Sequence, residues 1–288
     1  MKSSKALYRW SLVALLSLSG AGTAHAYRPF DGTDADVADL GEFELELGPA
    51  HLLREGGRTF VTTPTVLNLG IMPRTELVMD MVGSAPMHPY PATATEAGEA
   101  KYSVVDTDVF FKFLLRKGAL QEESGLSMAL EAGPLLPEIY GDDGYGASAN
   151  LILSERWGWF TVHLNNELEL SRSALDPIWS NSLITEFGVS RHWRPVAEIL
   201  WEQDIKAGVS LFSGLVGFIW SVVDDFDIDA AGVVSTSEGE QAYEVRLGLT
   251  WAVPVWEPSK LPRESEEDEP EESPNEEAKA HSEQHARK

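Results

Sequence analysis

The feature that most constrains this chain is an alternation of polar and apolar residues with a period of two. In residues 42–47 (EFELEL), carboxylates alternate with Phe and Leu side chains, and residues 161–165 and 243–251 repeat the pattern. Successive side chains of a β-strand point to opposite faces, so each segment has one polar and one apolar face. Helical amphipathicity is hard to find beyond the N-terminal region. The pattern therefore predicts an all-β domain.

The number of such segments predicts a large antiparallel sheet. Plainer but compatible strands are expected in the segments 76–82, 106–116, 126–134, 147–154, 183–190 and 196–202. Residues 209–223 form a nearly unbroken apolar run that is short for a transmembrane helix and is followed at once by Asp224 and Asp225. We interpret this run as one strand with apolar surroundings on both faces. The expected total is about twelve strands, within a range of roughly 10 to 14.

Connection lengths and aromatic positions favour a membrane barrel over a soluble sandwich. Short and long connections alternate along the chain, with tight gaps such as 71–74 and 155–157 and longer polar gaps at 84–102 and 136–145. The short gaps 54–58 and 204–208 depart from this alternation. Outer-membrane barrels have short periplasmic turns, longer outer loops and aromatic girdles near the strand ends, where most of the Trp residues fall here. We predict an antiparallel transmembrane β-barrel of the outer-membrane type over residues 27–256.

Both ends of the chain differ from this barrel. Basic residues at 2, 5 and 9, an apolar run over 12–18 and the sequence Ala24-His25-Ala26 predict a signal peptide, residues 1–26, that is cleaved on export. Residues 257–288 contain no Phe, Tyr, Trp, Ile or Val and are rich in Glu, Pro, Ser and Lys. Such a segment cannot bury enough apolar surface to fold, so we predict a disordered acidic tail in the periplasm.

Composition excludes several functions. The formal net charge is −24, from 22 basic and 46 acidic residues, whereas nucleic-acid binding needs a basic surface. The chain has no cysteine, so disulfides and thiolate metal sites are impossible. His281 and His285 lie four apart but lack the Glu of a zinc peptidase motif and are interpreted as solvated. We expect neither a metal site nor a cofactor.

Catalytic patterns are also missing. No Gly-x-Ser-x-Gly elbow occurs, and His163, near Asn165 and Glu167, is the one candidate base. A structural polar network explains that histidine better. The Asp residues at 225, 227 and 229 resemble the start of a calcium loop, but its glycine and distal glutamate are missing at the required spacing. Residues 31–39 and 142–144 are interpreted as ordinary acidic turns. We predict that the protein is not an enzyme.

If the apolar strand faces contact outer-membrane lipid, the polar faces line the lumen, because unpaired charges in hydrocarbon are costly. Strand parity then predicts a set of lumen-lining residues, mostly acidic: Glu44, Glu46, Glu76, Asp80, Asp106, Asp108, Lys112, Glu131, His163, Glu167, Glu198, Glu244 and Arg246. Pairing of acids with bases could hold such a lumen shut, or the surplus of carboxylates could favour cations in a pore. A narrow polar lumen is favoured over an open porin-like channel, because a barrel of this size leaves little free cross-section.

The N-terminal part of the barrel carries a family resemblance. Residues 28–38 and 41–49, with the later stretches 106–116, 213–225 and 244–251, resemble the outer-membrane family named for the MetA pathway of phenol degradation, also described as transporters. The resemblance implies a barrel related to aromatic-hydrocarbon and fatty-acid porins, and passage of small molecules, hydrophobic ones included. It carries over no site residues.

The expected function is therefore an outer-membrane channel or transporter for small molecules through a narrow acidic lumen. Its expected partners are outer-membrane lipid, the outer-membrane assembly machinery and an unidentified solute. The alternative is a protein without transport activity, either a closed structural barrel of the envelope or a soluble periplasmic β-sandwich with a binding role.

Overall fold

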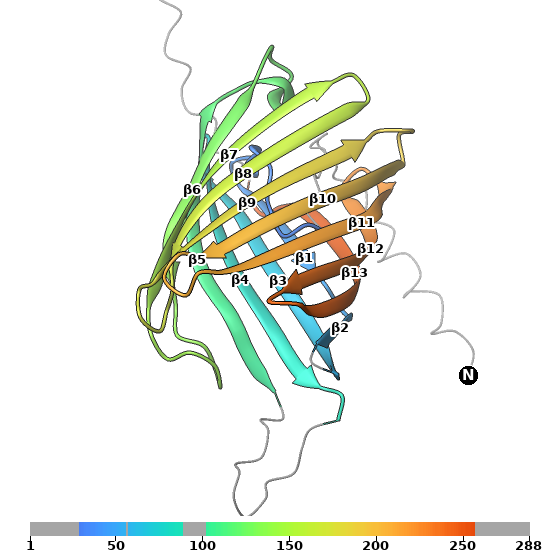
Figure 1. Cartoon of the computed structure of the whole chain (residues 1–288). Helices are drawn as coiled ribbons and strands as arrows, with labels where there is room; N and C mark the ends of the chain where they lie inside the picture. The colour runs from blue at the N-terminus through green and yellow to red at the C-terminus, as the bar shows by residue number, and fades with distance from the viewer. Residues whose placement is uncertain (1–28, 56, 89–101, 257–288) are drawn as a thin grey trace, which may run out of the picture. The chain divides into compact units, whose positions relative to one another are not determined.

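The computed structural model describes residues 29–55, 57–88 and 102–256, which form one closed antiparallel β-barrel (Figure 1). The predicted signal peptide and acidic tail lie outside the described residues. The strands are β1 (Glu42–Leu47), β2 (His51–Glu55), β3 (Arg58–Met72), β4 (Thr75–Pro86), β5 (Ser103–Arg116), β6 (Ser127–Leu135), β7 (Gly146–Trp157), β8 (Phe160–Leu170), β9 (Pro177–Phe187), β10 (Trp193–Asp204), β11 (Val209–Val223), β12 (Phe226–Ser237) and β13 (Glu240–Pro254).

The first two strands share one position in the barrel. Both β1 and β2 pair with β13 on one side and with β3 on the other, which also closes the sheet. Residues 48–50, with Pro49 lacking an N–H donor, interrupt the ladder between them. Thirteen segments therefore occupy twelve positions, and the predicted twelve-stranded antiparallel barrel is confirmed. The alternative of a β-sandwich is wrong, because a single sheet closes on itself.

The connections at the two ends differ as expected. One end of the barrel contains the first residue of β1 and the last residue of β13, and it is called the terminal end below. Here the links 73–74, 158–159 and 224–225 are two-residue turns, and residues 117–126 include the 3₁₀ turn Ala119–Gln121. The opposite end has the longest connection, 87–102, and the connection 136–145, which is as long as 117–126, together with short ones. No helix in the described part of the chain has the length and apolar character needed to cross a membrane.

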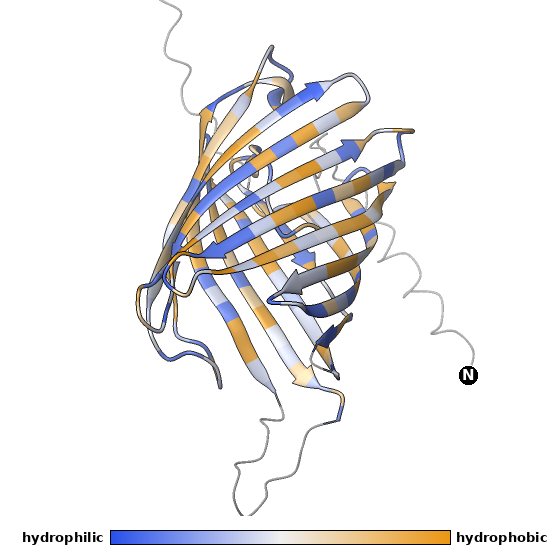
Figure 2. Cartoon of the chain, in the orientation of Figure 1, coloured by the Kyte–Doolittle hydropathy of each residue, from blue (hydrophilic) through white to orange (hydrophobic). Residues whose placement is uncertain are grey.

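The outward face of the barrel is apolar. Hydrophobic and hydrophilic residues alternate along the strands (Figure 2), and side chains such as Ile199 (64% exposed) and Val216 (69% exposed) project outward. Aromatic side chains gather near the strand ends. The rings of Trp193 and Trp220 stack 5.7 Å apart at the terminal end, and those of Trp179 and Trp201 lie 5.4 Å apart at the other. Two aromatic zones flanking an apolar band are typical of membrane barrels.

The apolar run at 209–223 is strand β11, as predicted. Leu215 and Ile219 are buried in a cluster with Val196, Ala231 and Val233, while Val216 on the alternate face is exposed. Phe30 packs against this cluster. The inner face of β11 is apolar because it contacts another segment of the chain.

Candidate functional site

The site begins with residues 29–40, which run inside the barrel (dark blue in Figure 1) and are called the lumen segment below. At the terminal end, the Ala38 N–H donates to the carboxylate of Glu76 in β4. Further along, the Ala35 N–H donates to Ser154 Oγ in β7 at 3.0 Å. The Thr33 N–H donates to Asn165 Oδ1 in β8 at 3.0 Å. The interpretation of residues 31–39 as ordinary acidic turns is therefore wrong.

The N-terminal part of the lumen segment contacts the opposite side of the barrel wall. The backbone N–H groups of Asp31 and Gly32 donate to the carboxylate of Glu198 in β10, at 2.8 and 2.9 Å. The Asp31 carboxylate pairs with Arg246 Nη2 in β13 at 2.7 Å, and Arg246 Nη1 donates to the Pro29 carbonyl at 2.8 Å. Contacts to β4, β7, β8, β10 and β13 mean that the segment crosses the lumen and narrows it.

Two further features hold the segment in place. Lys112 Nζ donates to Thr33 Oγ1 at 3.1 Å and lies 3.7 Å from the Asp34 carboxylate. Gly70 in β3 permits close approach, because a Cβ there would lie 2.0 Å from the Asp39 carbonyl oxygen. Sequence reasoning missed this segment because its contacts are largely made by backbone donors, which any sequence has. The signal that could have found it is the excess of inward carboxylates over inward bases, since buried acceptors need donors.

His163 lies in a buried network beside the lumen segment. Its Nδ1 is 2.8 Å from Ser154 Oγ, and its Nε2 is 3.2 Å from Glu186 Oε1. The order Ser, His, Glu resembles a hydrolase triad, but Ser154 is 0% exposed and accepts the Ala35 N–H. A nucleophile must reach a substrate. The structure thus gives His163 a structural environment, as the sequence analysis favoured.

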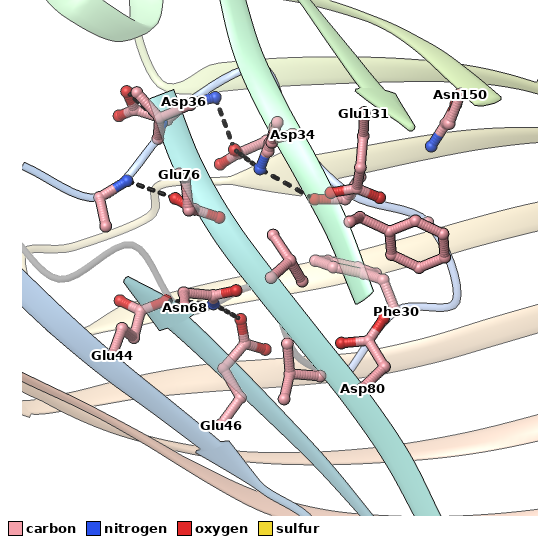
Figure 3. A pocket seen from close by; sticks show the side chains of 18 of the residues that line it. Phe30, Asp34, Asp36, Glu44, Glu46, Asn68, Glu76, Asp80, Glu131 and Asn150 are labelled. Atoms are coloured by element: carbon pink, nitrogen blue, oxygen red, sulfur yellow. Dashed lines mark hydrogen bonds and ion pairs between the residues drawn. The ribbon is translucent and has the colours of Figure 1, made fainter. Parts of the chain in front are cut away.

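Beside the lumen segment the interior contains a cavity of about 1260 Å³. Its lining runs along β4 from Glu76 to Ser84, roughly 26 Å at about 3.3 Å per residue. The lining residues include sixteen Asp and Glu side chains but five Lys and Arg side chains. Figure 3 shows carboxylates of the wall and of the lumen segment facing one another. This cavity is strongly acidic.

Of the thirteen predicted lumen residues, eleven line this cavity: Glu44, Glu46, Glu76, Asp80, Asp106, Asp108, Lys112, Glu131, Glu167, Glu244 and Arg246. The other two, His163 and Glu198, are buried in the hydrogen-bond networks described above. The structure adds residues that strand parity could not supply, because they belong to the lumen segment: Phe30, Asp31, Asp34, Asp36 and Asp39.

Several acids of the wall have a hydrogen-bond or ion-pair partner close by. His51 Nδ1 lies 3.0 Å from Glu244, and Asn68 Nδ2 donates to Glu46 at 3.0 Å. Arg172, from the connection after β8, pairs with Asp108 and lies 3.6 Å from Glu138. The cavity still has a surplus of carboxylates, because the acids outnumber the Lys and Arg side chains threefold.

Known proteins share the fold. The sequence matches no protein-family model, and a comparison with curated sequences finds no relative. Among solved structures, the barrel is similar to an outer membrane channel from Pseudomonas putida F1, with a TM-score of 0.56 and 9% identity over 78% of this chain and 100% of that chain. Structures of lower similarity include the KdgM porin, with a TM-score of 0.48 and 8% identity over 72% of this chain and 98% of that one. Another is the CymD monoaromatic hydrocarbon channel, with a TM-score of 0.44 and 6% identity over 75% and 89%. The first similarity establishes the class: this is an outer-membrane-type β-barrel.

Proposed function

We propose that the protein is an outer-membrane channel for small molecules, with a lumen that favours cations and is narrowed by the lumen segment. The observation that carries the proposal is the acid-lined cavity inside a barrel whose outer face is apolar. Carboxylates facing water in a low-dielectric wall attract cations and repel anions.

The apolar outer face supports residence in the outer membrane. Exposed side chains such as Leu164, Val216 and Leu247 would contact acyl chains, which removes them from water. The predicted signal peptide would direct the chain to the periplasm, and the outer-membrane assembly machinery would insert it. The short turns of the terminal end would then face the periplasm, as they do in other barrels of this type.

The resemblance to the phenol-degradation family suggests hydrophobic solutes, whereas the cavity is mainly polar. Val78, Phe110 and Leu135 form one apolar cluster among the cavity-lining wall residues. We therefore propose that solutes are small and polar or amphipathic rather than wholly apolar.

A closed structural barrel is the second candidate, and the lumen segment favours it. This segment has hydrogen bonds to strands around the barrel, and such contacts are typical of a plug. A closed barrel would carry no current, whereas the proposed channel would conduct even if weakly.

Planar-bilayer recording of the purified mature protein separates the two candidates. We expect discrete conductance steps in KCl, and a reversal potential in a KCl gradient that shows K⁺ passing more readily than Cl⁻. Replacing Cl⁻ by a bulky anion should change the current little. A silent bilayer, with the barrel shown to be folded by its heat-sensitive gel mobility, would contradict the channel and favour the structural barrel.

A further inference from the structure

A row of inward residues crosses the cavity wall from β5 to β8. In the register of the sheet, Glu131 lies opposite Lys112 on one side and opposite Asn150 on the other, and Asn150 lies opposite Glu167. Neighbouring strands are about 4.8 Å apart, so the backbones of Glu131 and Glu167 lie about 10 Å apart on either side of Asn150, and their flexible side chains can reach one small group between them. Figure 3 places Glu131 and Asn150 on the same side of the cavity.

The orientation of the Asn150 amide is set by its neighbours. The Thr33 N–H donates to Asn165 Oδ1, and Asn165 Nδ2 donates to the Thr33 carbonyl at 2.8 Å, so Asn165 has one possible orientation. Asn150 Nδ2 must then donate to Asn165 Oδ1, which it does at 3.0 Å. The remaining atom, Asn150 Oδ1, has no hydrogen-bond donor among the described residues. The Asn150 side chain is buried, with 7% of its surface exposed. A buried acceptor without a donor is costly, so this atom indicates a missing donor.

The bases near this row are engaged with other groups. Lys112 is held by Thr33 and Asp34 of the lumen segment, and Arg172 is held by Asp108 and Glu138. Asp80 lies opposite Asp108 in the ladder between β4 and β5, and its Oδ1 has no donor among the described residues. Arg172 offsets the charge of Asp108, whereas Glu131 and Glu167 have no ion pair with Lys or Arg among the described residues.

An apolar group lies next to these acids. Val78, Phe110 and Leu135 pack together and line the same cavity. Gly133, between Glu131 and Leu135 in β6, allows this packing, because a Cβ there would lie 2.9 Å from the ring of Phe110. The ring therefore sits against the strand two residues from Glu131. The wall thus combines acceptors and apolar surface side by side.

We propose that the cavity binds an organic ammonium ion with an apolar body. The ammonium group donates to Glu131, Glu167 and Asn150 Oδ1, and the apolar body lies toward Phe110. An ammonium has three donors and no acceptor, which matches three acceptors. A metal ion fits less well, because the described residues contain no group of three His, Cys, Asp or Glu side chains that could hold one. The physiological meaning of the site, uptake of such amines, rests on the proposed channel.

Isothermal titration calorimetry of the purified barrel in detergent tests the site without requiring conduction. The probe is phenethylammonium chloride, and the matched neutral probe is 2-phenylethanol. We expect the amine to bind at least about tenfold more tightly than the alcohol, because each charge-assisted hydrogen bond contributes strongly. Equal binding of the two probes, or no binding of the amine, would overturn the proposal.

Substitutions at Glu131 and Glu167 test whether the ammonium group binds at this row. Glu131→Gln combined with Glu167→Gln should weaken amine binding about tenfold to a hundredfold and leave the alcohol unaffected. Glu42→Gln is the matched control, because it removes a cavity carboxylate from β1, away from this row, and should change the affinity less than twofold. Glu131→Gln alone and Glu167→Gln alone should each weaken amine binding severalfold, which keeps the test decisive if the double variant folds poorly.

Binding and conduction can fail separately. A barrel that binds the amine but carries no current would contradict the proposed channel while supporting the site. A barrel that conducts cations but fails to distinguish the amine from the alcohol would support the channel and overturn the site. A double variant that binds the amine as tightly as the native barrel, with native gel mobility, would also overturn the site.

Discussion

Glu198 and Glu131 face the interior of the same barrel by the same strand parity, yet they have different surroundings. Glu198 in β10 is 3% exposed and accepts the N–H groups of Asp31 and Gly32 together with the hydroxyl of Ser182. Glu131 in β6 lines the cavity. Glu198 thus binds the lumen segment directly, whereas Glu131 is a cavity carboxylate that we propose contacts solutes.

The difference shows that inward orientation does not determine the role of a lumen carboxylate. A carboxylate that accepts several backbone N–H groups is part of the folded structure, because its removal leaves those donors unsatisfied. A carboxylate facing a water-filled cavity can be neutralised at little cost to folding, and its charge acts on solutes instead. The comparison predicts that stability and selectivity will respond to different residues.

The largest expected effect follows from deleting residues 29–40. The lumen should then widen, because the segment that crosses it is gone, and single-channel conductance should rise severalfold. Planar-bilayer recording measures this directly. Conductance equal to that of the full chain would mean that the lumen segment does not limit passage. It would also contradict the different roles given to Glu198 and Glu131.

The next effect separates Glu198 from Glu131 by stability. Glu198→Ala should lower the free energy of unfolding by about 2–3 kcal/mol, because charge-assisted hydrogen bonds are lost and N–H donors are left buried. Glu131→Ala should cost less than about 1 kcal/mol, because water can replace the carboxylate. Urea unfolding in lipid vesicles, followed by Trp fluorescence, measures both. Equal losses of unfolding free energy would indicate that Glu198 and Glu131 contribute equally to stability.

The effects on ion selectivity should have the opposite order, with the cavity acids mattering more than Glu198. Asp80→Asn, Glu131→Gln and Glu167→Gln together should reduce the permeability ratio of K⁺ to Cl⁻ severalfold, because three cavity charges are removed. Glu198→Gln should leave the ratio nearly unchanged. The measurement is the reversal potential in a KCl gradient. A larger change for Glu198→Gln than for the triple variant would contradict the assignment of roles.

The smallest effect concerns a single ion pair of the lumen segment. Asp31→Asn removes the charge that faces Arg246 while keeping the backbone contacts to Glu198. We expect a loss of about 1 kcal/mol in unfolding free energy, because Arg246 retains Glu244 at 2.8 Å. A more frequent transition between conductance levels should accompany it. A loss of unfolding free energy as large as that of Glu198→Ala would mean that the ion pair with Arg246, and not the backbone N–H groups, holds the lumen segment in place.

Much of the fold could be predicted from the sequence. Period-two alternation in segments such as 42–47 and 243–251 assigned strands and faces, because a β-strand has only two faces and the cost of charge in hydrocarbon separates them. The same parity placed Glu76, Asp80 and Glu131 inward, and the structure puts them on the cavity wall. It also identified residues 209–223 as a strand with two apolar faces.

The sequence by itself determined which side chains point inward; only the tertiary structure decided what those side chains contact. The break between β1 and β2 and the path of residues 29–40 across the lumen depend on contacts between positions far apart in the chain. Glu198 is 167 residues from Asp31, and the bond between them uses a backbone N–H that no residue pattern marks. Local periodicity reports the direction of a side chain from its own strand, whereas its partner depends on closure of the whole barrel.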